Sequence, residues 1–255
     1  MARALAGGVR KTRLDQLLVD RGLAETRTRA QAMVLAGEVF AGERRLDKPG
    51  QPVAGDLDVA IRRRTGDWVS RGAHKLIGAL DRFALDPTGA VALDVGASTG
   101  GFTEVLLARG AGRVYAVDVG HGQLHARLRR DPRVVVLERT NARYLDRRLV
   151  PEPVDLVVCD ASFISLTLVL PPALALARAG ARLVALIKPQ FEAGRDEVGK
   201  GGVVRDPAVH AAVCARIRDW LGDEMHWVVE GTAPSPITGP KGNREFLLVA
   251  HRPGA

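Results

Sequence analysis

The chain has 255 residues, of which 46% are hydrophobic and 26% charged, so it is long enough for one large domain or for a small and a medium one. Its net charge of +8 and pI of about 10.2 favour a polyanionic partner such as nucleic acid, although acidic membranes or simple solubility fit the same charge. No uncharged apolar run reaches the roughly 20 residues that span a bilayer, and the N-terminus lacks the apolar segment of a secretory signal. We therefore expect a cytoplasmic protein.

The first quarter of the chain predicts a small basic module. Residues 1–71 hold 14 Lys and Arg against 9 Asp and Glu, which places +5 of the net +8 there. Leu14, Leu17 and Leu18 share one face of a helix that Gly22 would end. The segment Thr28–Gln31 predicts a capping box that opens a second short helix.

Two short strands joined by a turn at Gly42 are predicted over residues 39–46, and residues 57–61 predict another strand that closes the unit. Two helices followed by a small strand set resemble the S-four-like RNA-binding module of ribosomal proteins. A small helical cap with a solvated basic face is the alternative. Basic side chains on such a face bind phosphates without reading bases. The RNA-binding candidates are Arg13, Arg27, Arg29, Arg62, Arg63, Arg64 and Arg71.

Residues 62–68 are too polar for a core and predict a linker. After residue 70, helical and apolar strand patterns alternate. Helices are expected near 76–83, 102–109, 124–130, after Pro171-Pro172 and near 208–221, and strands at 91–95, 113–119, 134–138, 155–160, 182–187, 226–231 and 245–250. The expected domains are a tail at 1–10, the S-four-like domain at 11–61, a linker at 62–70 and a large domain at 71–255.

Apolar strands that alternate with helices predict an α/β fold with a mostly parallel sheet covered on both faces. The last two strands lack an intervening helix, so they should pair antiparallel. A seven-stranded sheet with one antiparallel terminal strand is typical of the Rossmann-like methyltransferase fold rather than of a dehydrogenase.

A glycine-rich loop, "DVGASTGGF", follows the first strand of this sheet, at the edge where such sheets bind ligands. Ser98 stands where a dinucleotide fingerprint has its second glycine, and the carboxylate of Asp94 would repel pyrophosphate. That carboxylate suits the cationic methionine moiety of S-adenosylmethionine, which carries no phosphate. Asp118 ends the next strand, where an acid can accept both ribose hydroxyls.

We therefore predict S-adenosylmethionine rather than a nicotinamide cofactor. Asn141, after the third strand, would hydrogen-bond the adenine or simply cap a turn. The predicted cofactor-binding residues are Asp94, Gly96, Ala97, Ser98, Thr99, Gly100, Gly101, Phe102, Asp118, Val119, Asn141 and Ala142.

Two classes of methyl acceptor fit the sequence poorly. The segment Asp160-Ala-Ser-Phe163 has the spacing of exocyclic-amine methyltransferases but lacks both prolines of their motif. Methylation of a pyrimidine carbon needs a cysteine nucleophile. Cys159 lies inside a strand, on the face opposite Asp160, and Cys214 lies in a helix. Both cysteines predict reduced core thiols, and their spacing predicts no metal site.

Methylation of a ribose oxygen fits better, because it needs a group that deprotonates a poorly acidic hydroxyl. A lysine does this when burial or a second cation lowers its pKa. Lys75, Asp160, Lys188 and Glu245 all stand at strand or helix ends that should converge on one edge of the sheet. We expect Lys188 to be the base, Lys75 to assist it and hold ribose or phosphate, and the two acids to orient the amines.

Lys, Asp, Lys and Glu in this order resemble the tetrad of the FtsJ-type ribose 2′-O-methyltransferases. More closely, "SRGAHKL", "LDVGASTGGFTEVLL", "VVVLERTNAR", "DLVVCDASFIS", "IKPQFE" and "GGVVRDP" look like the TlyA family, bacterial proteins once called hemolysins. The resemblance runs from about residue 11 to 250. It implies 2′-O-methylation of cytidine in ribosomal RNA, of the large subunit or of both subunits, and sensitivity to capreomycin-type antibiotics.

The sequence reads "TGDWVSRG" where well-known members with both substrates have Arg-Ala-Trp-Val, and it stops five residues after the last predicted strand. Both features favour the large subunit alone. Residues 192–206, rich in glycine and charge, predict a mobile lid, an RNA-contacting loop or a solvated crossover. A non-catalytic RNA-binding protein and a membrane-active hemolysin are the two alternative function classes.

Overall fold

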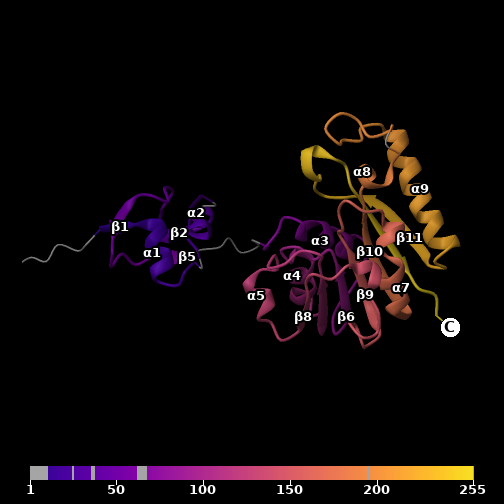
Figure 1. Cartoon of the computed structure of the whole chain (residues 1–255), viewed down its shortest axis with the longest axis horizontal. Helices are drawn as coiled ribbons and strands as arrows, with labels where there is room; N and C mark the ends of the chain where they lie inside the picture. The colour runs from indigo at the N-terminus through magenta and orange to yellow at the C-terminus, as the bar shows by residue number, and fades with distance from the viewer. Residues whose placement is uncertain (1–10, 25, 36–37, 62–67, 195, 255) are drawn as a thin grey trace, which may run out of the picture. The chain divides into compact units, whose positions relative to one another are not determined.

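The computed structural model describes the chain except for residues 1–10, 25, 36–37, 62–67, 195 and 255, and it divides into two units, residues 1–67 and 68–255 (Figure 1). The break falls in the polar segment that predicted a linker. Trp68, Val69 and Ser70 belong to the second unit, where Trp68 and Val69 pack against an apolar core. The finer boundaries given above stay a prediction.

The first unit places two helices against short strands. Its elements are β1 (Lys11–Arg13), α1 (Leu14–Asp20), α2 (Arg27–Leu35), β2 (Val39–Ala41), β3 (Arg44–Arg45), β4 (Pro52–Ala54) and β5 (Ala60–Ile61). β2 pairs antiparallel with β3 and β5, and β1 pairs with β4. Leu14, Leu17 and Leu18 of α1 are buried against Met33 and Val34 of α2, as the apolar spacing predicts.

The start of α2 differs from the prediction. The helix begins at Arg27, and the backbone N–H of Ala30 already donates to the carbonyl of Thr26. Thr28 therefore lies inside the helix, and the capping box is wrong. The side chain of Gln31 instead donates to Asp15 Oδ2 of α1 at 2.9 Å, a contact that no local pattern reveals.

Asp15 is a fully buried carboxylate that connects β1, α1 and α2. It accepts hydrogen bonds from Arg13 at 2.9 and 3.0 Å, from Gln31 at 2.9 Å and from Arg27 at 3.3 Å. These donors, Arg13 above all, lower the pKa of Asp15 below its usual range despite its burial. The carboxylate thus stays ionised and fixes one end of each guanidinium.

The second unit follows the predicted alternation of helices and strands. Its helices are α3 (Ala73–Arg82), α4 (Gly101–Ala108), α5 (Ala126–Arg129), α6 (Leu166–Val169), α7 (Pro171–Leu176), α8 (Pro189–Glu192) and α9 (Pro207–Asp223), with 3₁₀ turns η1 (Ala142–Tyr144) and η2 (Pro240–Gly242). Its strands are β6 (Val91–Val95), β7 (Arg113–Val117), β8 (Val134–Leu137), β9 (Val154–Cys159), β10 (Ala177–Ile187), β11 (Val228–Pro234) and β12 (Phe246–His251).

The strands form one seven-stranded sheet in the order β11-β12-β10-β9-β6-β7-β8. Pairing is parallel from β10 to β8, and β12 runs antiparallel to both of its neighbours. The order and the single antiparallel strand confirm the predicted methyltransferase fold. Helices α3 and α4 cover one face of the sheet and α7 and α9 the other (Figure 1).

Alternation along the strands decides which face each side chain joins. Leu156 and Val158 of β9 pack on the face of α3 and α4, whereas Val157 and Cys159 pack on the face of α7 and α9. The first residue after β9 therefore returns to the side of α3. In the part of the chain that the structure describes, no helix has the length and apolarity to cross a membrane.

The contacts of Asp15 lead to a prediction for the first unit. We expect Asp15→Asn to destabilise α1 by about 2 kcal/mol at pH 7, because hydrogen bonds to charged groups are lost inside the core. Since the folded pKa lies below the unfolded value of 3.8, the carboxylate stabilises the fold fully above pH 3.8 and loses this effect as pH falls further. Hydrogen exchange of α1 amides in the whole chain, read by mass spectrometry, measures the difference.

The matched control is Asp20→Asn, because Asp20 lies on the same helix, is exposed and accepts a hydrogen bond from Gln16 at the surface. It should change exchange little at any pH. Equal effects of the two substitutions, or a pH-independent effect of Asp15→Asn, would contradict the prediction.

Candidate functional site

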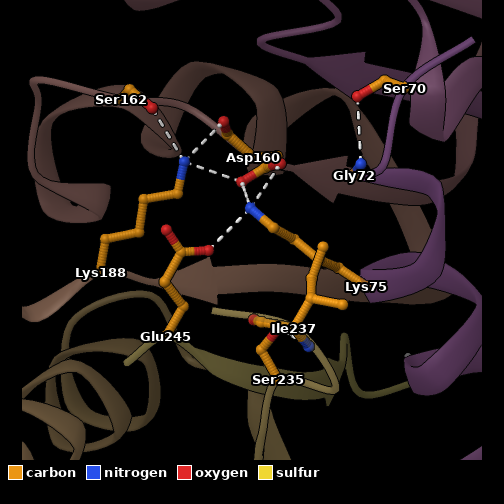
Figure 2. A network of polar contacts seen from close by, with 9 residues as sticks. All are labelled: Ser70, Gly72, Lys75, Asp160, Ser162, Lys188, Ser235, Ile237 and Glu245. Atoms are coloured by element: carbon orange, nitrogen blue, oxygen red, sulfur yellow. Dashed lines mark hydrogen bonds and ion pairs between the residues drawn. The ribbon is translucent and has the colours of Figure 1, made fainter. Parts of the chain in front are cut away.

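The four charged residues singled out in the sequence meet at the carboxyl edge of the parallel strands. Asp160 follows β9, Lys188 follows β10 and Glu245 precedes the antiparallel β12. Alternation puts all three on the face of the sheet that α3 covers, and α3 carries Lys75. Four segments far apart in the sequence thus deliver one cluster (Figure 2).

Asp160 lies between the two ammonium groups. Its carboxylate oxygens are 3.0 and 3.1 Å from Lys75 Nζ, and Oδ1 is 2.8 Å from Lys188 Nζ. Lys75 Nζ is also 2.7 Å from Glu245 Oε2. Lys75, Lys188 and Glu245 are buried, so two basic and two acidic side chains lie against one another in a largely enclosed site (Figure 2).

Lys188 makes two further contacts that the sequence analysis did not predict. Its Nζ donates to the backbone carbonyl of Asp160 at 3.0 Å and to Ser162 Oγ at 2.9 Å. Ser162 was not among the predicted site residues. The only signal in the sequence was its place in the segment "CDASFIS", two residues after Asp160.

Gly239 is a second residue that the sequence analysis missed. A Cβ at this position would come within 2.1 Å of Glu245 Oε1 and 2.8 Å of its carboxyl carbon. The loop before β12 therefore packs directly on the carboxyl group, which is 2% exposed as a residue. Gly239 leaves the space in which Glu245 reaches Lys75.

The glycine-rich loop runs from the end of β6 into α4. Asp118, after β7, accepts the backbone N–H of Ser98 at 2.8 Å through Oδ2 and that of Gly120 at 2.7 Å through Oδ1. Gly100 has φ +99, and a Cβ there would lie 2.2 Å from Leu128. Asp118 and the packing against α5 together fix the shape of the loop.

A cleft of about 510 Å³ opens beside this loop. Six of the predicted cofactor-binding residues line it, namely Gly96, Ser98, Asp118, Val119, Asn141 and Ala142. Gln123, Thr140, Arg143 and Phe163 are also in its wall. The size and the mixed polar and apolar lining suit a nucleoside-sized ligand.

A smaller cavity of about 220 Å³ contains all four charged residues together with the start of α4. Predicted cofactor residues Ala97, Thr99, Gly101 and Phe102 and the predicted RNA contact Arg71 line it. Gly96, Ser98, Asp160 and Ser162 line both cavities. Ligands in the two cavities would therefore meet at this shared wall.

Two of the predicted cofactor-binding residues, Asp94 and Gly100, line neither cavity. Asp94 is fully buried, and its Oδ2 accepts a hydrogen bond from Thr103 Oγ1 at 2.6 Å. Burial raises its pKa to about 7. Asn141 lines the cleft and also caps η1, since its Oδ1 accepts the backbone N–H of Arg143 at 3.1 Å.

The thiols do not provide a nucleophile. Cys159 and Cys214 are both free, and burial raises the pKa of Cys159 to about 12 and that of Cys214 to about 11. Thiolate, the reactive form, is therefore scarce at neutral pH. The described residues contain no group of three or more His, Cys, Asp or Glu placed to hold a metal ion.

The predicted RNA-binding arginines fall into three sets. Arg13 and Arg27 are half exposed, with 53% and 52% of their side chains accessible, while their inner ends bind Asp15. Arg71 is exposed at the smaller cavity. Arg62, Arg63, Arg64 and the side chain of Arg29 lie outside the described residues.

The loop at 192–206 is tied to the segment before β12. The backbone N–H of Val204 donates to Asn243 Oδ1 at 3.2 Å, and Lys241 Nζ donates to the carbonyl of Gly201 at 3.0 Å. The same segment carries Gly239 and Glu245. This loop thus contacts the part of the chain that positions one acid of the cluster.

Comparisons with known proteins agree with this division. The family described as FtsJ-like methyltransferase matches residues 68–252, and the S4 domain family matches residues 12–59. A solved structure of a candidate hemolysin from Streptococcus thermophilus superposes with a TM-score of 0.72 at 39% identity, covering 96% of this chain and 90% of that one.

Curated relatives extend over nearly the whole chain. The 16S/23S rRNA (cytidine-2′-O)-methyltransferase TlyA of Mycobacterium tuberculosis is 50% identical over 94% of this chain and 89% of its own length. Hemolysin A of Brachyspira hyodysenteriae is 37% identical over 92% and 98%. The 23S rRNA (cytidine-2′-O)-methyltransferase TlyA of Campylobacter jejuni is 35% identical over 71% and 69%.

Asp118 gives a test of the larger cleft. We expect Asp118→Ala to weaken S-adenosylmethionine binding at least tenfold, because the loop loses two backbone contacts and the cleft loses its acidic acceptor; the loss of about 1.4 kcal/mol that this represents is modest for charged hydrogen bonds. Isothermal titration calorimetry measures the affinity.

Asp131→Ala is the matched control, since Asp131 also accepts a backbone N–H, that of Arg133 at 2.9 Å, but lines neither cavity. Its affinity should equal that of the unmodified chain. Unchanged binding by Asp118→Ala would mean that the cofactor lies elsewhere.

Proposed function

The chain belongs to the TlyA family of rRNA (cytidine-2′-O)-methyltransferases, and from this we propose that it methylates the ribose 2′-hydroxyl of a cytidine in large-subunit ribosomal RNA. It is an S-adenosylmethionine-dependent methyltransferase of the FtsJ-like type with an S4 domain. The observation that carries the proposal is the buried cluster of Lys75, Asp160, Lys188 and Glu245 beside the cofactor cleft.

The larger cleft fits the cofactor. Asp118 offers carboxylate oxygens where a ribose needs acceptors, and Val119 and Ala142 offer apolar contacts for a base. When bound, S-adenosylmethionine supplies an electrophilic methyl group on its sulfonium. The wall formed by Gly96, Ser98 and Asp160 belongs to both cavities, so it is where the acceptor would approach the methyl donor.

Lys188 is the proposed base. Lys75 contacts two carboxylates, whereas Lys188 shares the single carboxylate of Asp160 and otherwise contacts uncharged oxygens. Lys188 therefore has fewer anionic partners than Lys75. As a neutral amine it accepts the proton of the ribose hydroxyl, which makes the oxygen a competent nucleophile.

The other three residues position and balance the charges. Asp160 lies at hydrogen-bond distance from both amines, and Glu245 forms a second ion pair with Lys75. Lys75, as a cation, stabilises the developing negative charge on the ribose oxygen or binds the adjacent phosphate.

RNA binding is assigned to the basic side chains. The S4 domain carries Arg13 and Arg27 with their outer ends exposed, and Arg71 lies at the mouth of the smaller cavity. These groups contact phosphate and set the register of the RNA without reading its bases. We assign ribosomal RNA, free or within a subunit, as the partner, and the cytoplasm as the place where they meet.

Relatives that bear the name hemolysin and relatives that bear the name methyltransferase match the same length of this chain. The hemolysin name is a historical label of the family. No observation on the described residues favours membrane activity as a second function.

Lys188→Ala should abolish methyl transfer to ribosomal RNA, while S-adenosylmethionine affinity stays within about twofold, because Lys188 lines only the smaller cavity. Lys188→Arg keeps the charge but cannot serve as a base, since a guanidinium does not deprotonate in proteins. It should be equally inactive. Transfer of tritiated methyl groups to purified subunits is the measurement, and full activity of either variant would refute Lys188 as the base.

The RNA target has its own test. Cells with the intact gene should carry a 2′-O-methylated cytidine in large-subunit RNA that is absent when the gene is deleted, and their small-subunit RNA should be unchanged. Primer extension at low nucleotide concentration maps such sites. A gene-dependent site in small-subunit RNA would correct the target to both subunits, and no gene-dependent site would refute the proposed function.

A further inference from the structure

The Nζ atom of Lys188 has three oxygen atoms within hydrogen-bond distance. Asp160 Oδ1 is 2.8 Å from Nζ, the carbonyl oxygen of Asp160 is 3.0 Å away and Ser162 Oγ is 2.9 Å away. An ammonium has three N–H donors, so each donor has one acceptor (Figure 2). Only 6% of the side chain is exposed, so these three oxygens account for most of the surroundings of the nitrogen.

The neutral amine needs a different set of partners. A neutral amine has two N–H groups and one lone pair, and the lone pair accepts a hydrogen bond from a neighbouring donor. An ionised carboxylate and a backbone carbonyl only accept hydrogen bonds, whereas a serine hydroxyl also donates. Of the three oxygens around Lys188, Ser162 Oγ is therefore the one that can turn its proton toward the lone pair.

Ser162 also lies where the substrate hydroxyl must arrive. It lines both cavities, while Lys188 lines only the smaller one. Ser162 is exposed as a residue, whereas Lys188 is 5% exposed. A ribose placed at the shared wall can contact Ser162 Oγ, and it reaches Lys188 Nζ directly only by displacing one of the three oxygens.

The backbone beyond Ser162 is held in an unusual conformation. Phe163 has φ +64, in the left-handed region that non-glycine residues seldom adopt, and its ring centroid lies 5.0 Å from that of Phe191. Such strain persists where the surroundings impose it, which is frequent in active sites.

We propose that Ser162 is a further catalytic residue that relays the ribose proton to Lys188; this rests on the function proposed above. The 2′-O–H bond breaks as its proton moves to Ser162 Oγ, and the proton that Ser162 held moves to Lys188 Nζ. Ser162 ends as a neutral hydroxyl and Lys188 as an ammonium. The electron pair left on the ribose oxygen forms the bond to the methyl carbon, and the pair of the broken carbon–sulfur bond stays on sulfur.

The test compares Ser162→Ala with Ser162→Thr. Loss of the hydroxyl should lower the single-turnover rate of methyl transfer about 100-fold, the lower end of the usual contribution of a proton-transfer group. Threonine keeps the hydroxyl and should restore the rate to within about tenfold of the unmodified chain. Calorimetry with S-adenosylmethionine and filter binding of subunit RNA should give affinities within about twofold for both variants.

Ser165→Ala is the matched control in the same segment. Ser165 Oγ contacts Glu192 and caps α6 but lines neither cavity and does not contact Lys188. Its removal should leave the single-turnover rate unchanged.

The number of moving protons separates the relay from direct transfer. The single-turnover rate is measured in mixtures of H₂O and D₂O and plotted against the deuterium fraction. For the unmodified chain the plot should be curved, which indicates that two protons move in the transition state. For Ser162→Ala it should be a straight line. An unmodified chain with a straight line, or a Ser162→Ala variant with the full rate, would refute the relay and leave Lys188 as the direct base.

Two other results are equally decisive. If Ser162→Ala loses cofactor affinity in proportion to its rate and threonine does not restore it, Ser162 is structural and the relay is refuted. If the unmodified chain transfers no methyl group to either subunit, the proposed function fails, whereas an active chain with a fully active Ser162→Ala variant refutes only the relay.

Discussion

The site depends on one carboxylate that two lysines share. Asp160 lies 2.8 to 3.1 Å from Lys75 and Lys188, and both ammonium groups are buried. Removing a charge from water costs several kcal/mol, so neither lysine would be stable there without its acid. The partners come from α3, β9, β10 and the start of β12. The cluster therefore forms only when these strands pair in the correct order and α3 packs on the sheet. The fold and the chemistry are therefore coupled through the same four side chains.

The parallel sheet also explains why two cavities share a wall. Loops after adjacent parallel strands emerge at one edge, so the loop after β6 and the turn after β9 lie side by side there. Gly96 and Ser98 come from the first, and Asp160 and Ser162 from the second. Under the proposed function, a methyl donor on one side of this wall and an acceptor on the other lie next to each other. Proximity of this kind is a large part of what an enzyme supplies for group transfer.

Three carboxylates, of Asp15, Asp94 and Asp160, differ in the partners that surround them. Asp15 has two guanidinium partners and stays ionised, so it anchors the arginines of the S4 domain. Asp94 has only the hydroxyl of Thr103, and burial raises its pKa to about 7. Asp160 contacts two amines and belongs to the cavity in which chemistry is proposed. The three carboxylates thus differ in their neighbouring donors: guanidinium groups at Asp15, a hydroxyl at Asp94 and two amines at Asp160.

The sequence by itself determined the fold class and the alternation of strands and helices. It also determined the positions of four residues at element ends, namely Lys75, Asp160, Lys188 and Glu245. Both follow from local patterns, because the spacing of apolar residues and the order of segments can be read along the chain. The sequence also placed the glycine-rich loop between β6 and α4. Only the tertiary structure decided the contacts between distant segments: Ser162 on Lys188, Gly239 against Glu245, Gln31 on Asp15, and Asp94 enclosed away from both cavities. Such contacts depend on the direction of side chains from neighbouring strands and helices and on which polar groups lie close enough to pair. The periodicity of a single segment contains neither piece of information.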